Sequence, residues 1–506
     1  MTEASVSTHL RQMLAAASLL LGACSQAPAP VPTAPTGGLR QPNIIIVLAD
    51  DMSWHDSGAY GGLDVPTPTI DRLAREGMRF THAFQSTAMC AVTRQQLLTG
   101  LDPMRSGAYP QHSFVKAGTL SVFHHLKAAG YRVGLTGKTH FGPASAFPYE
   151  TVGDPSGGGD DPDLPAVDFE AVTRFVTRDP TEPFFLVVAS HNPHVPYTQG
   201  DASAFDPARV HVPAYLVDTP VTRRSLTRYY AEITALDGEF ARILGIVDAA
   251  GVAGNTLVLF TSEQGNAVPF AKWTLYDAGV RTQMIVRWPG EVRAGAITDA
   301  MVSYADVVPT LVAAAGGEPL AQTDGMSFLP VLHGRSDTLR THVYGIHTNL
   351  GIIGGEAYPI RSVRNERYKL IRNLLPDAPY RNLLNNTASG DAVYRDWQLA
   401  AKAGDAFAAA RLAAYEKRPA VELYDIETDP FELHNRAGER ALAAVQSGLE
   451  AELDRWLLQQ GDRGVSAERD AFRYINPELV KRLRLQVPNP GTLPAADADA
   501  GRQQPH

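Results

Sequence analysis

Polar residues that can bind a metal or exchange protons cluster at three places, each directly after a run of apolar residues. The clusters are Asp50-Asp51, His191-Asn192-Pro193-His194 and Glu263-Gln264. Adjacent carboxylates at the end of a strand are costly unless a cation neutralises them. Carboxylate and amide oxygens select a hard cation, calcium or magnesium, rather than zinc. A single pair fits an ordinary turn or helix cap, but three such clusters predict a divalent metal site.

A cysteine and an arginine lie one helical turn apart in the segment 90–100. Helical spacing puts Arg94 on the same face as Cys90. A cysteine at the start of a helix meets the positive end of the helix dipole, where an anion is stabilised, and an arginine beside it can hold an oxyanion. The alternative is a buried cysteine next to a surface arginine, which the spacing alone does not exclude.

Two lysines and a histidine add positive charge near these clusters. Lys138 and His140 alternate in the stretch 137–142, which we expect to be extended, and Lys272 follows the pair Glu263-Gln264. Cations and a histidine near a metal can form a cage for a tetrahedral anion. Each of these side chains taken alone fits a solvated surface residue.

The elements that must position these residues alternate between short apolar runs and helical patterns. Strands are predicted at 43–48, 131–136, 184–189, 256–261 and 284–288, and helices at 69–76, 122–129 and 224–249. The helix at 69–76 has Thr67 or Thr69 as its N-cap. This alternation predicts an α/β fold with a mostly parallel sheet covered by helices on both faces. Ligands in such sheets gather at the carboxyl ends of the strands, which is where the three polar clusters lie.

The pattern changes beyond about residue 341. A hairpin is predicted at 360–371 around Asn365-Glu366, a strand at 422–426 and a helix at 437–460. These elements predict a smaller α+β subdomain with an antiparallel sheet. The expected organisation is therefore a catalytic domain at 41–340, a C-terminal subdomain at 341–461 and an irregular tail at 462–506.

The N-terminus has the pattern of an export signal. A short apolar stretch after Arg11 ends at Leu21-Gly22-Ala23-Cys24, as in a bacterial lipoprotein signal at 1–24, and a proline-rich linker follows at 25–40. We therefore expect an exported protein, lipid-anchored through Cys24 on the periplasmic side of a bacterial membrane. A plain secretory signal or an uncleaved anchor helix is the alternative.

Composition excludes two further classes of protein. The 506 residues carry a formal net charge of -9, so no overall basic field is available for nucleic acid. Only two cysteines, Cys24 and Cys90, are present, which excludes a disulfide framework.

The order of the motifs resembles the type I sulfatases of the alkaline-phosphatase-like superfamily, over residues 42 to about 460. The matching motifs are Pro42-Asn43 through Asp50-Asp51, Pro66 to Leu73, Cys90 to Gly100, Gly137 to His140, His191 to Pro196, Thr261 to Gly265, Val286 to Gly290 and Glu422 to Asp425. The resemblance implies a large, mostly parallel sheet sandwiched by helices, with a smaller C-terminal α+β subdomain.

The resemblance also implies a modified nucleophile and a metal ion. In the family the motif cysteine, here Cys90, is oxidised to formylglycine, whose hydrate attacks sulfur and whose second hydroxyl later expels sulfate. Calcium, or magnesium, polarises the sulfate oxygens. The implied metal ligands are Asp50, Asp51, Glu263 and Gln264.

The remaining roles follow by the same correspondence. Arg94 would hold the hydrated aldehyde, and His140 would assist its deprotonation and the recovery of the aldehyde. Lys138, His194 and Lys272 would bind sulfate, with His194 or Lys272 protonating the leaving group.

This chain departs from the family pattern at two places. Val92 and Thr93 stand where the family has proline or alanine and then serine, which bears on recognition by the modifying enzyme. Glu263-Gln264 replaces an Asp-Asn pair, so the ligand class is kept while each side chain is one methylene longer.

The function that the resemblance implies is hydrolysis of a sulfuric ester or sulfamate bond. The substrate would be a sulfated small molecule or glycan, and the subgroup most resembled contains glycan sulfatases and sulfamidase-like members. A formylglycine-generating enzyme is an implied partner. The alternatives are a phosphonate or phosphate ester hydrolase of the same superfamily and a catalytically inactive glycan-binding lipoprotein. The chemical state of Cys90 in purified protein would discriminate between them.

Overall fold

The computed structural model describes residues 41–154, 167–385, 392–475, 477–482 and 485, within a compact unit that begins at Gln41. The export signal at 1–24, with Cys24, and the linker at 25–40 lie outside the described residues, as do residues 486–506 of the tail. Within the described part of the chain, no helix is both long enough and apolar enough to span a bilayer.

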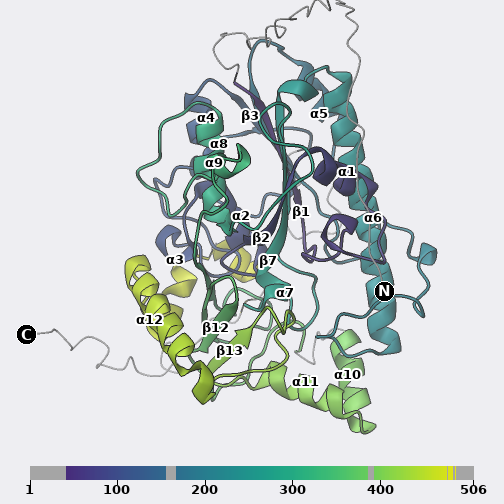
Figure 1. The fold of residues 1–506 in the computed structure, drawn as a ribbon, viewed down its shortest axis with the longest axis vertical. Coiled ribbons are helices and arrows are strands. Elements are labelled where there is room, and N and C mark those ends of the chain that lie inside the picture. The colour runs from purple at the N-terminus through teal and green to yellow at the C-terminus, as the bar shows by residue number, and fades with distance from the viewer. Residues whose placement is uncertain (1–40, 155–166, 386–391, 476, 483–484, 486–506) are drawn as a thin grey trace, which may run out of the picture. The chain divides into compact units, whose positions relative to one another are not determined.

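A nine-stranded sheet forms the centre of the fold (Figure 1). Its order is β4-β3-β5-β1-β6-β7-β2-β8, and β9 also pairs with β2. Only β7 runs antiparallel to its neighbours, so the prediction of a mostly parallel sheet is confirmed. The strands are β1 (Asn43–Ala49), β2 (Met78–Phe84), β3 (Arg132–Gly137), β4 (Glu150–Thr151), β5 (Phe184–Ala189), β6 (Thr256–Ser262), β7 (Arg281–Arg287), β8 (Ala296–Thr298) and β9 (Val302–Ser303).

Strand β1 explains why its sequence is apolar at every position. Ile45 and Val47 point into the hydrophobic core on one face of the sheet, whereas Ile44, Ile46 and Leu48 point into the core on the other. A strand buried on both faces shows no polar alternation.

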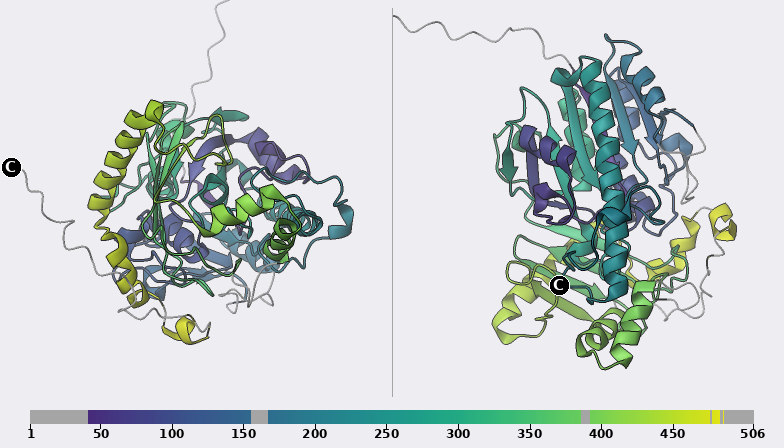
Figure 2. Two further views of the ribbon diagram at one scale, coloured as in Figure 1. Left: turned by 90° about the horizontal axis from the view of Figure 1, so that it is seen from below. Right: turned by 90° about the vertical axis from the view of Figure 1, so that its right-hand side faces the viewer.

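Helices cover both faces of this sheet, as predicted (Figure 1). The first core is completed by α1 (Pro68–Glu76), α5 (Phe169–Thr177) and α6 (Pro220–Ala249), the longest helix (Figure 2, right). The second core is completed by α2 (Cys90–Thr99), α4 (Val122–Ala128), α8 (Val307–Ala314) and α9 (Leu329–Leu332). The short helices α3 (Pro103–Ser106) and α7 (Asp277–Val280) lie in connecting segments.

The start of α1 differs from the prediction in one detail. Thr67 occupies the N-cap position, but its side chain makes no capping hydrogen bond. The carboxylate of Asp237, on α6, instead accepts hydrogen bonds from the amides of Thr69, at 3.0 Å, and Ile70, at 2.9 Å. A cap supplied by another helix leaves no local sequence signal.

The smaller sheet is antiparallel throughout, in the order β10-β11-β12-β13. The predicted hairpin and the last strand are confirmed. The strands are β10 (Val343–His347), β11 (Ile360–Arg364), β12 (Tyr368–Asn373) and β13 (Val421–Asp425), and the helices nearby are α10 (Ala392–Lys402), α11 (Ala406–Glu416) and α12 (Ala443–Gln460). Helix α12 packs on this sheet through a stacked pair, Tyr344 and Trp456, whose ring centroids are 4.5 Å apart. The predicted boundary near residue 340 falls between β9 and β10.

The beginning of the predicted irregular tail is built of short helical turns. These include α13 (Ala467–Asp470), and α14 (Pro477–Arg482) follows. The segment returns to the large domain: the Tyr109 hydroxyl donates to the carbonyl of Ala467 at 2.7 Å, and the Phe114 amide donates to the carbonyl of Tyr474 at 2.9 Å. Turns this short show no periodicity in the sequence.

Glu468, on α13, is expected to make stability depend on pH. Its side chain is buried, accepts a hydrogen bond from Thr348, and burial raises its pKa to about 7 from an ordinary value of 4.5. The folded protein keeps this proton where the unfolded chain has lost it, so the free energy of unfolding falls as pH rises between these values, by about 3 kcal/mol. Glu468→Gln removes that slope. In thermal unfolding at pH 5 and pH 8, the variant should gain on the wild type at pH 8; parallel pH curves would contradict the assignment.

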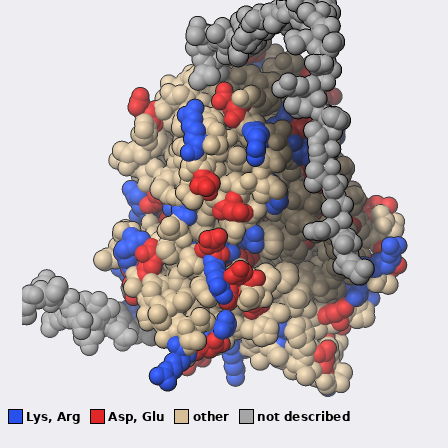
Figure 3. Space-filling model, in the orientation of Figure 1, with Lys and Arg blue, Asp and Glu red and all other residues tan. Residues whose placement is uncertain are grey.

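The surface agrees with the charge balance of the sequence. On the face shown in Figure 3, acidic and basic side chains are interspersed rather than gathered by sign. This distribution fits a protein that does not depend on a broad basic surface.

Candidate active site

The three polar clusters meet because the strands that precede them are neighbours. Strand β1 lies between β5 and β6 and is parallel to both, with Leu48 beside Ala189 and Ala49 beside Ser262. The carboxyl ends of the three strands therefore share one edge of the sheet. There the Asp50 amide donates to the carbonyl of Asn192 at 3.0 Å, which joins two of the clusters directly.

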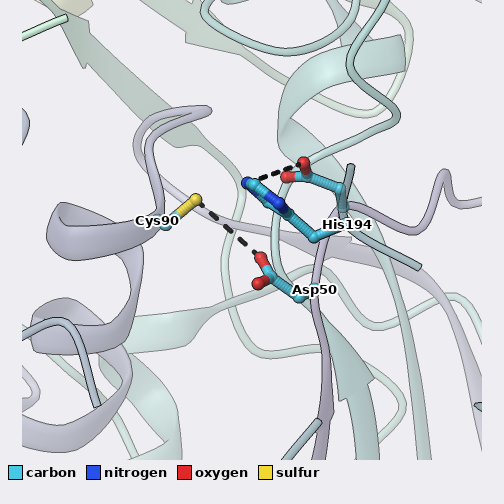
Figure 4. Close-up of side chains that lie close together, drawn as sticks. Asp50, Cys90 and His194 are labelled. Atoms are coloured by element: carbon cyan, nitrogen blue, oxygen red, sulfur yellow. Dashed lines mark hydrogen bonds and ion pairs between the residues drawn. The ribbon is translucent and has the colours of Figure 1, made fainter. Parts of the chain in front are cut away.

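Helix α2 presents Cys90 to this edge. Cys90 is its first residue, is 1% exposed, and places Sγ 3.8 Å from Oδ1 of Asp50 (Figure 4). Ligand atoms of Asp50, Asp51, Cys90 and His194 all lie within 4.8 Å of one another, and the four could hold a metal ion. The positions of the polar clusters at the strand ends predicted that Asp50, Asp51 and His194 would be neighbours.

Three buried cations face three buried carboxylates. Lys138 Nζ lies 2.6 Å from Asp50 Oδ2, and Lys272 Nζ lies 2.6 Å from Asp51 Oδ2. Arg94, one turn after Cys90, makes a close ion pair with Glu263 and is 3.8 Å from Asp50 Oδ2. Since these charges balance, a divalent cation bound among them would leave the site positive. Such a site attracts an anion.

Gln264 has a buried amide group next to Asp51 and Cys90. Its Nε2 lies 2.5 Å from Asp51 Oδ1 and 2.8 Å from Cys90 Sγ. Its Oε1 is buried and, among the described residues, has no hydrogen-bond partner. The amide faces Asp51 through Nε2, and a half-turn of the amide would present its oxygen to the same group. With the carboxylates of Asp50 and Asp51, that set of oxygen donors fits calcium or magnesium. Glu263 makes its ion pair with Arg94 through Oε1, while its other carboxylate oxygen, Oε2, lies 3.3 Å from Gln264 Nε2.

Burial and charge set the ionisation of the site in opposite ways. Burial alone would raise the pKa of Asp50, but Lys138 and His194 outweigh burial and hold it well below its usual range. For Cys90, burial dominates and raises the thiol pKa well above its ordinary value, although Lys272 opposes it. The expected stabilisation of a thiolate at the helix start is therefore overridden by desolvation.

The two histidines after β5 are placed differently. His194 Nε2 lies 3.6 Å from Asp51 Oδ2, and its Nδ1 contacts the carbonyl of Val195. Because a carbonyl only accepts, Nδ1 is the donor, and Nε2 faces the site. Burial lowers the pKa of His194, and burial lowers that of His191 to about 4. The structure thus brings His194, rather than His191, into the group with Cys90.

His140 does not continue the alternation expected for residues 137–142. Strand β3 ends at Gly137, and His140 has a φ of 51°, in the left-handed region, so the stretch is not extended there. Lys138 turns to Asp50, whereas the His140 ring packs against His112, with centroids 4.9 Å apart. The prediction of an extended stretch through residue 140 is therefore wrong, because the backbone turns at His140.

A carboxylate from α6 and a glycine after β6 help to hold the site in place. Glu239, on α6, accepts hydrogen bonds from Ser190 Oγ at 2.6 Å and Asn192 Nδ2 at 3.0 Å, on either side of His191. At Gly265, a Cβ would lie 1.8 Å from the carbonyl of Ala278, so only glycine fits beside Gln264. Glu239 gave no sequence signal because its partners lie on another element.

The two departures after Cys90 are accommodated locally. Val92 is buried in a small apolar cluster with Met89, Trp273 and Ile352. The Thr93 hydroxyl donates to the carbonyl of Thr87 at 3.0 Å, a bond that a serine could also make. The valine therefore fills space between α2 and two loops.

Comparison with protein families and known proteins agrees with this geometry. Residues 42–317 match the Sulfatase family, and residues 265–385 match the family described as N-sulphoglucosamine sulphohydrolase, C-terminal. An ulvan-active sulfatase of Formosa agariphila is 30% identical over 425 residues, covering 84% of this chain and 81% of that protein. The N-sulphoglucosamine sulphohydrolase of Homo sapiens is 29% identical over 485 residues, covering 85% of this chain and 92% of that protein.

A likeness to a solved structure supports the fold. The phosphonate monoester hydrolase of Agrobacterium radiobacter superposes with a TM-score of 0.64 at 19% identity, covering 84% of this chain and 97% of that one. At this identity the likeness shows a shared fold alone. Together with the family matches, the edge-of-sheet site around Cys90 leads to one conclusion: the chain belongs to the sulfatase family of hydrolases.

Proposed function

We propose that this sulfatase removes sulfate from a carbohydrate, as an ester or a sulfamate, with a formylglycine made from Cys90 and a calcium ion. The observation that carries the proposal is the placement of Cys90 at the buried start of α2, with Asp50, Asp51 and His194 around it. A formylglycine at this position would stand among three cations that suit a sulfate group.

The metal would be held by oxygen donors from the ends of β1 and β6. We assign Asp50, Asp51 and Gln264 to it, with Glu263 as the fourth, longer ligand that Arg94 also contacts. The ion would supply a Lewis acid that polarises the sulfate oxygens. Magnesium has the same ligand class, but the site offers several carboxylate oxygens, which favours calcium.

The chain's own cations orient the sulfate and complete the proton transfers. Lys138 and Lys272 are each held by one carboxylate oxygen, so their ammonium groups have fixed positions at the site. Burial alone would lower the pKa of Lys272, but Asp51 outweighs it, so this lysine stays charged and binds an anion. Lys272, which is charged, or His194 in its doubly protonated form, with Nε2 facing the site, would give a proton to the leaving group. His140 takes part in the proton transfer that accompanies release of sulfate from residue 90.

The carbohydrate assignment is supported by the relatives. The ulvan-active sulfatase and the N-sulphoglucosamine sulphohydrolase are both named for glycan substrates, and the C-terminal match belongs to the latter family. We therefore expect glucosamine N-sulfate or an O-sulfated oligosaccharide to be turned over.

A substrate panel tests this function. Purified protein is offered 4-nitrophenyl sulfate, glucosamine N-sulfate, a sulfated oligosaccharide, 4-nitrophenyl phosphate and a phosphonate monoester. The expected result is release of sulfate from at least one sugar with a higher kcat/KM than for either phosphorus ester. Faster turnover of phosphate or phosphonate would favour the second hydrolase, and glycan binding without turnover would favour an inactive binding protein.

We also propose that Cys24 carries the lipid anchor and that the protein works on the periplasmic side of a bacterial membrane. The support is the sequence Leu21-Gly22-Ala23-Cys24 and the proline-rich linker after it. Cys24→Ser is expected to move the protein from the membrane fraction to the soluble periplasm. A wild type that is already soluble, or a variant still bound to membranes, would show that Cys24 is not the anchor.

A further inference from the structure

The segment from Tyr109 to Val115 lies beside the helix that begins at Cys90, although no motif marks it. The amide of Ala91, next to Cys90, donates to Gln111 Oε1 at 3.3 Å, and Gln95 Nε2 donates to the carbonyl of Ser113 at 2.8 Å. At its far end the Val115 amide donates to the carbonyl of Gly142 at 3.0 Å, two residues after His140. The segment is therefore fastened both to the Cys90 helix and to the chain that carries His140.

His112 lies in the middle of this segment and is only 6% exposed. Its ring packs on that of His140, with centroids 4.9 Å apart and planes inclined by 48°. His112 has a φ of 62° and His140 a φ of 51°, so both facing histidines sit in the left-handed region. Such conformations are strained for a residue other than glycine and persist where surrounding contacts impose them, often at functional sites.

A hydrogen bond to the loop after β10, a strand of the smaller sheet, holds the ring of His112. Its Nδ1 lies 2.8 Å from the carbonyl of Gly351, in the loop after β10. Since a carbonyl only accepts, Nδ1 is the donor, and this hydrogen bond orients the ring. At Gly351 a Cβ would lie 2.2 Å from the carbonyl of Gln111, so glycine is required for this approach.

We propose that His112 is a positioning residue for His140. The Gly351 carbonyl orients the His112 ring, and this ring packs on the His140 imidazole and limits its movement. The proposal rests on the proposed function, in which His140 acts in the release of sulfate from residue 90. Loss of the His112 ring should therefore slow that release more than it weakens substrate binding.

Kinetics of His112→Ala with an aryl sulfate test the proposal. We expect kcat to fall about 10- to 100-fold, the range seen when a residue that orients an active-site group is removed, and KM to fall in parallel, so that kcat/KM stays nearly unchanged. Since the first half of the reaction is spared, a burst of phenol should precede slow turnover, and intact mass should show sulfated enzyme. His112→Phe, which keeps a ring but not the bond to Gly351, should recover part of kcat.

Two comparisons separate positioning from general destabilisation. Tyr109→Phe removes a hydrogen bond to Ala467 from the same segment and should lower thermal stability without a burst. His140→Ala should show the same burst as His112→Ala, and the double variant should be no slower than His140→Ala alone.

Several outcomes would overturn the proposal. They are a wild-type kcat in His112→Ala, a rise in KM alone, additive losses in the double variant, or a burst in Tyr109→Phe. If His140→Ala itself turned over normally, the role given to His140 in the proposed function would be what failed.

Discussion

Replacing Asp51 by alanine is expected to abolish metal binding and sulfate hydrolysis together. Asp51 joins the parts of the site: its Oδ1 contacts Gln264 Nε2 and its Oδ2 contacts Lys272 Nζ. Removing it deletes a proposed metal ligand and leaves Lys272, which is 3% exposed, without its carboxylate. We expect kcat/KM to fall by about 10³-fold or more.

The metal is measured independently of turnover. Titration calorimetry with calcium should show a site in the wild type and none in Asp51→Ala, and calcium should raise the Tm of the wild type only. Asp51→Asn keeps the volume and one oxygen donor, and should retain partial binding if alanine destabilises the fold.

A buried aspartate away from the site is the matched control. Asp237→Ala removes the cap of α1 and should lower stability by about 1 kcal/mol while leaving calcium binding intact. Full calcium affinity in folded Asp51→Ala, or stoichiometric zinc in protein isolated without added metal, would contradict the assignment.

Much of the fold was predictable because its signals are local. Buried strands such as β1 and β5 are continuous apolar runs. Such runs indicate strands covered by helices on both faces, and strands of that kind are usually parallel to their neighbours. From that arrangement the meeting of Asp50, His191 and Glu263 at one edge also followed. The antiparallel direction of β7 and the turns at 464–475 did not follow, because strand direction depends on the connection and isolated turns have no period.

The parts of the site that were missed depend on contacts between distant elements. Glu239 acts from the middle of α6, where a carboxylate usually marks a solvated face, and His112 acts through a carbonyl of the smaller sheet's loop. The left-handed turn at His140 has no marker either, since the residue is not glycine. The sequence therefore predicted the site residues that belong to a family motif, but not the residues that hold them in position.

Cys90→Ser is expected to be the most damaging single substitution, with kcat reduced by about 10⁴- to 10⁶-fold. The native side chain is itself unsuited to the reaction as a thiol. Burial raises the thiol pKa well above its ordinary value, so little thiolate is present, and a sulfated thiol has no neighbouring hydroxyl to expel the sulfate. A formylglycine in its place supplies that hydroxyl, so activity should follow the extent of conversion rather than the amount of protein.

Conversion is the quantity to measure, because Val92 and Thr93 depart from the family's motif next to Cys90. We expect a mixture of aldehyde and thiol, with turnover proportional to the aldehyde fraction in peptides spanning residues 88–94. Coexpression with a formylglycine-generating enzyme should raise both together, and Val92→Pro should raise conversion further if the valine limits recognition. Val92→Ala separates recognition from packing, since it empties the cluster with Trp273 and Ile352 without introducing proline. Full sulfatase turnover from protein whose Cys90 is entirely thiol would refute the mechanism, because a sulfated thiol carries no hydroxyl on the same carbon to expel the sulfate.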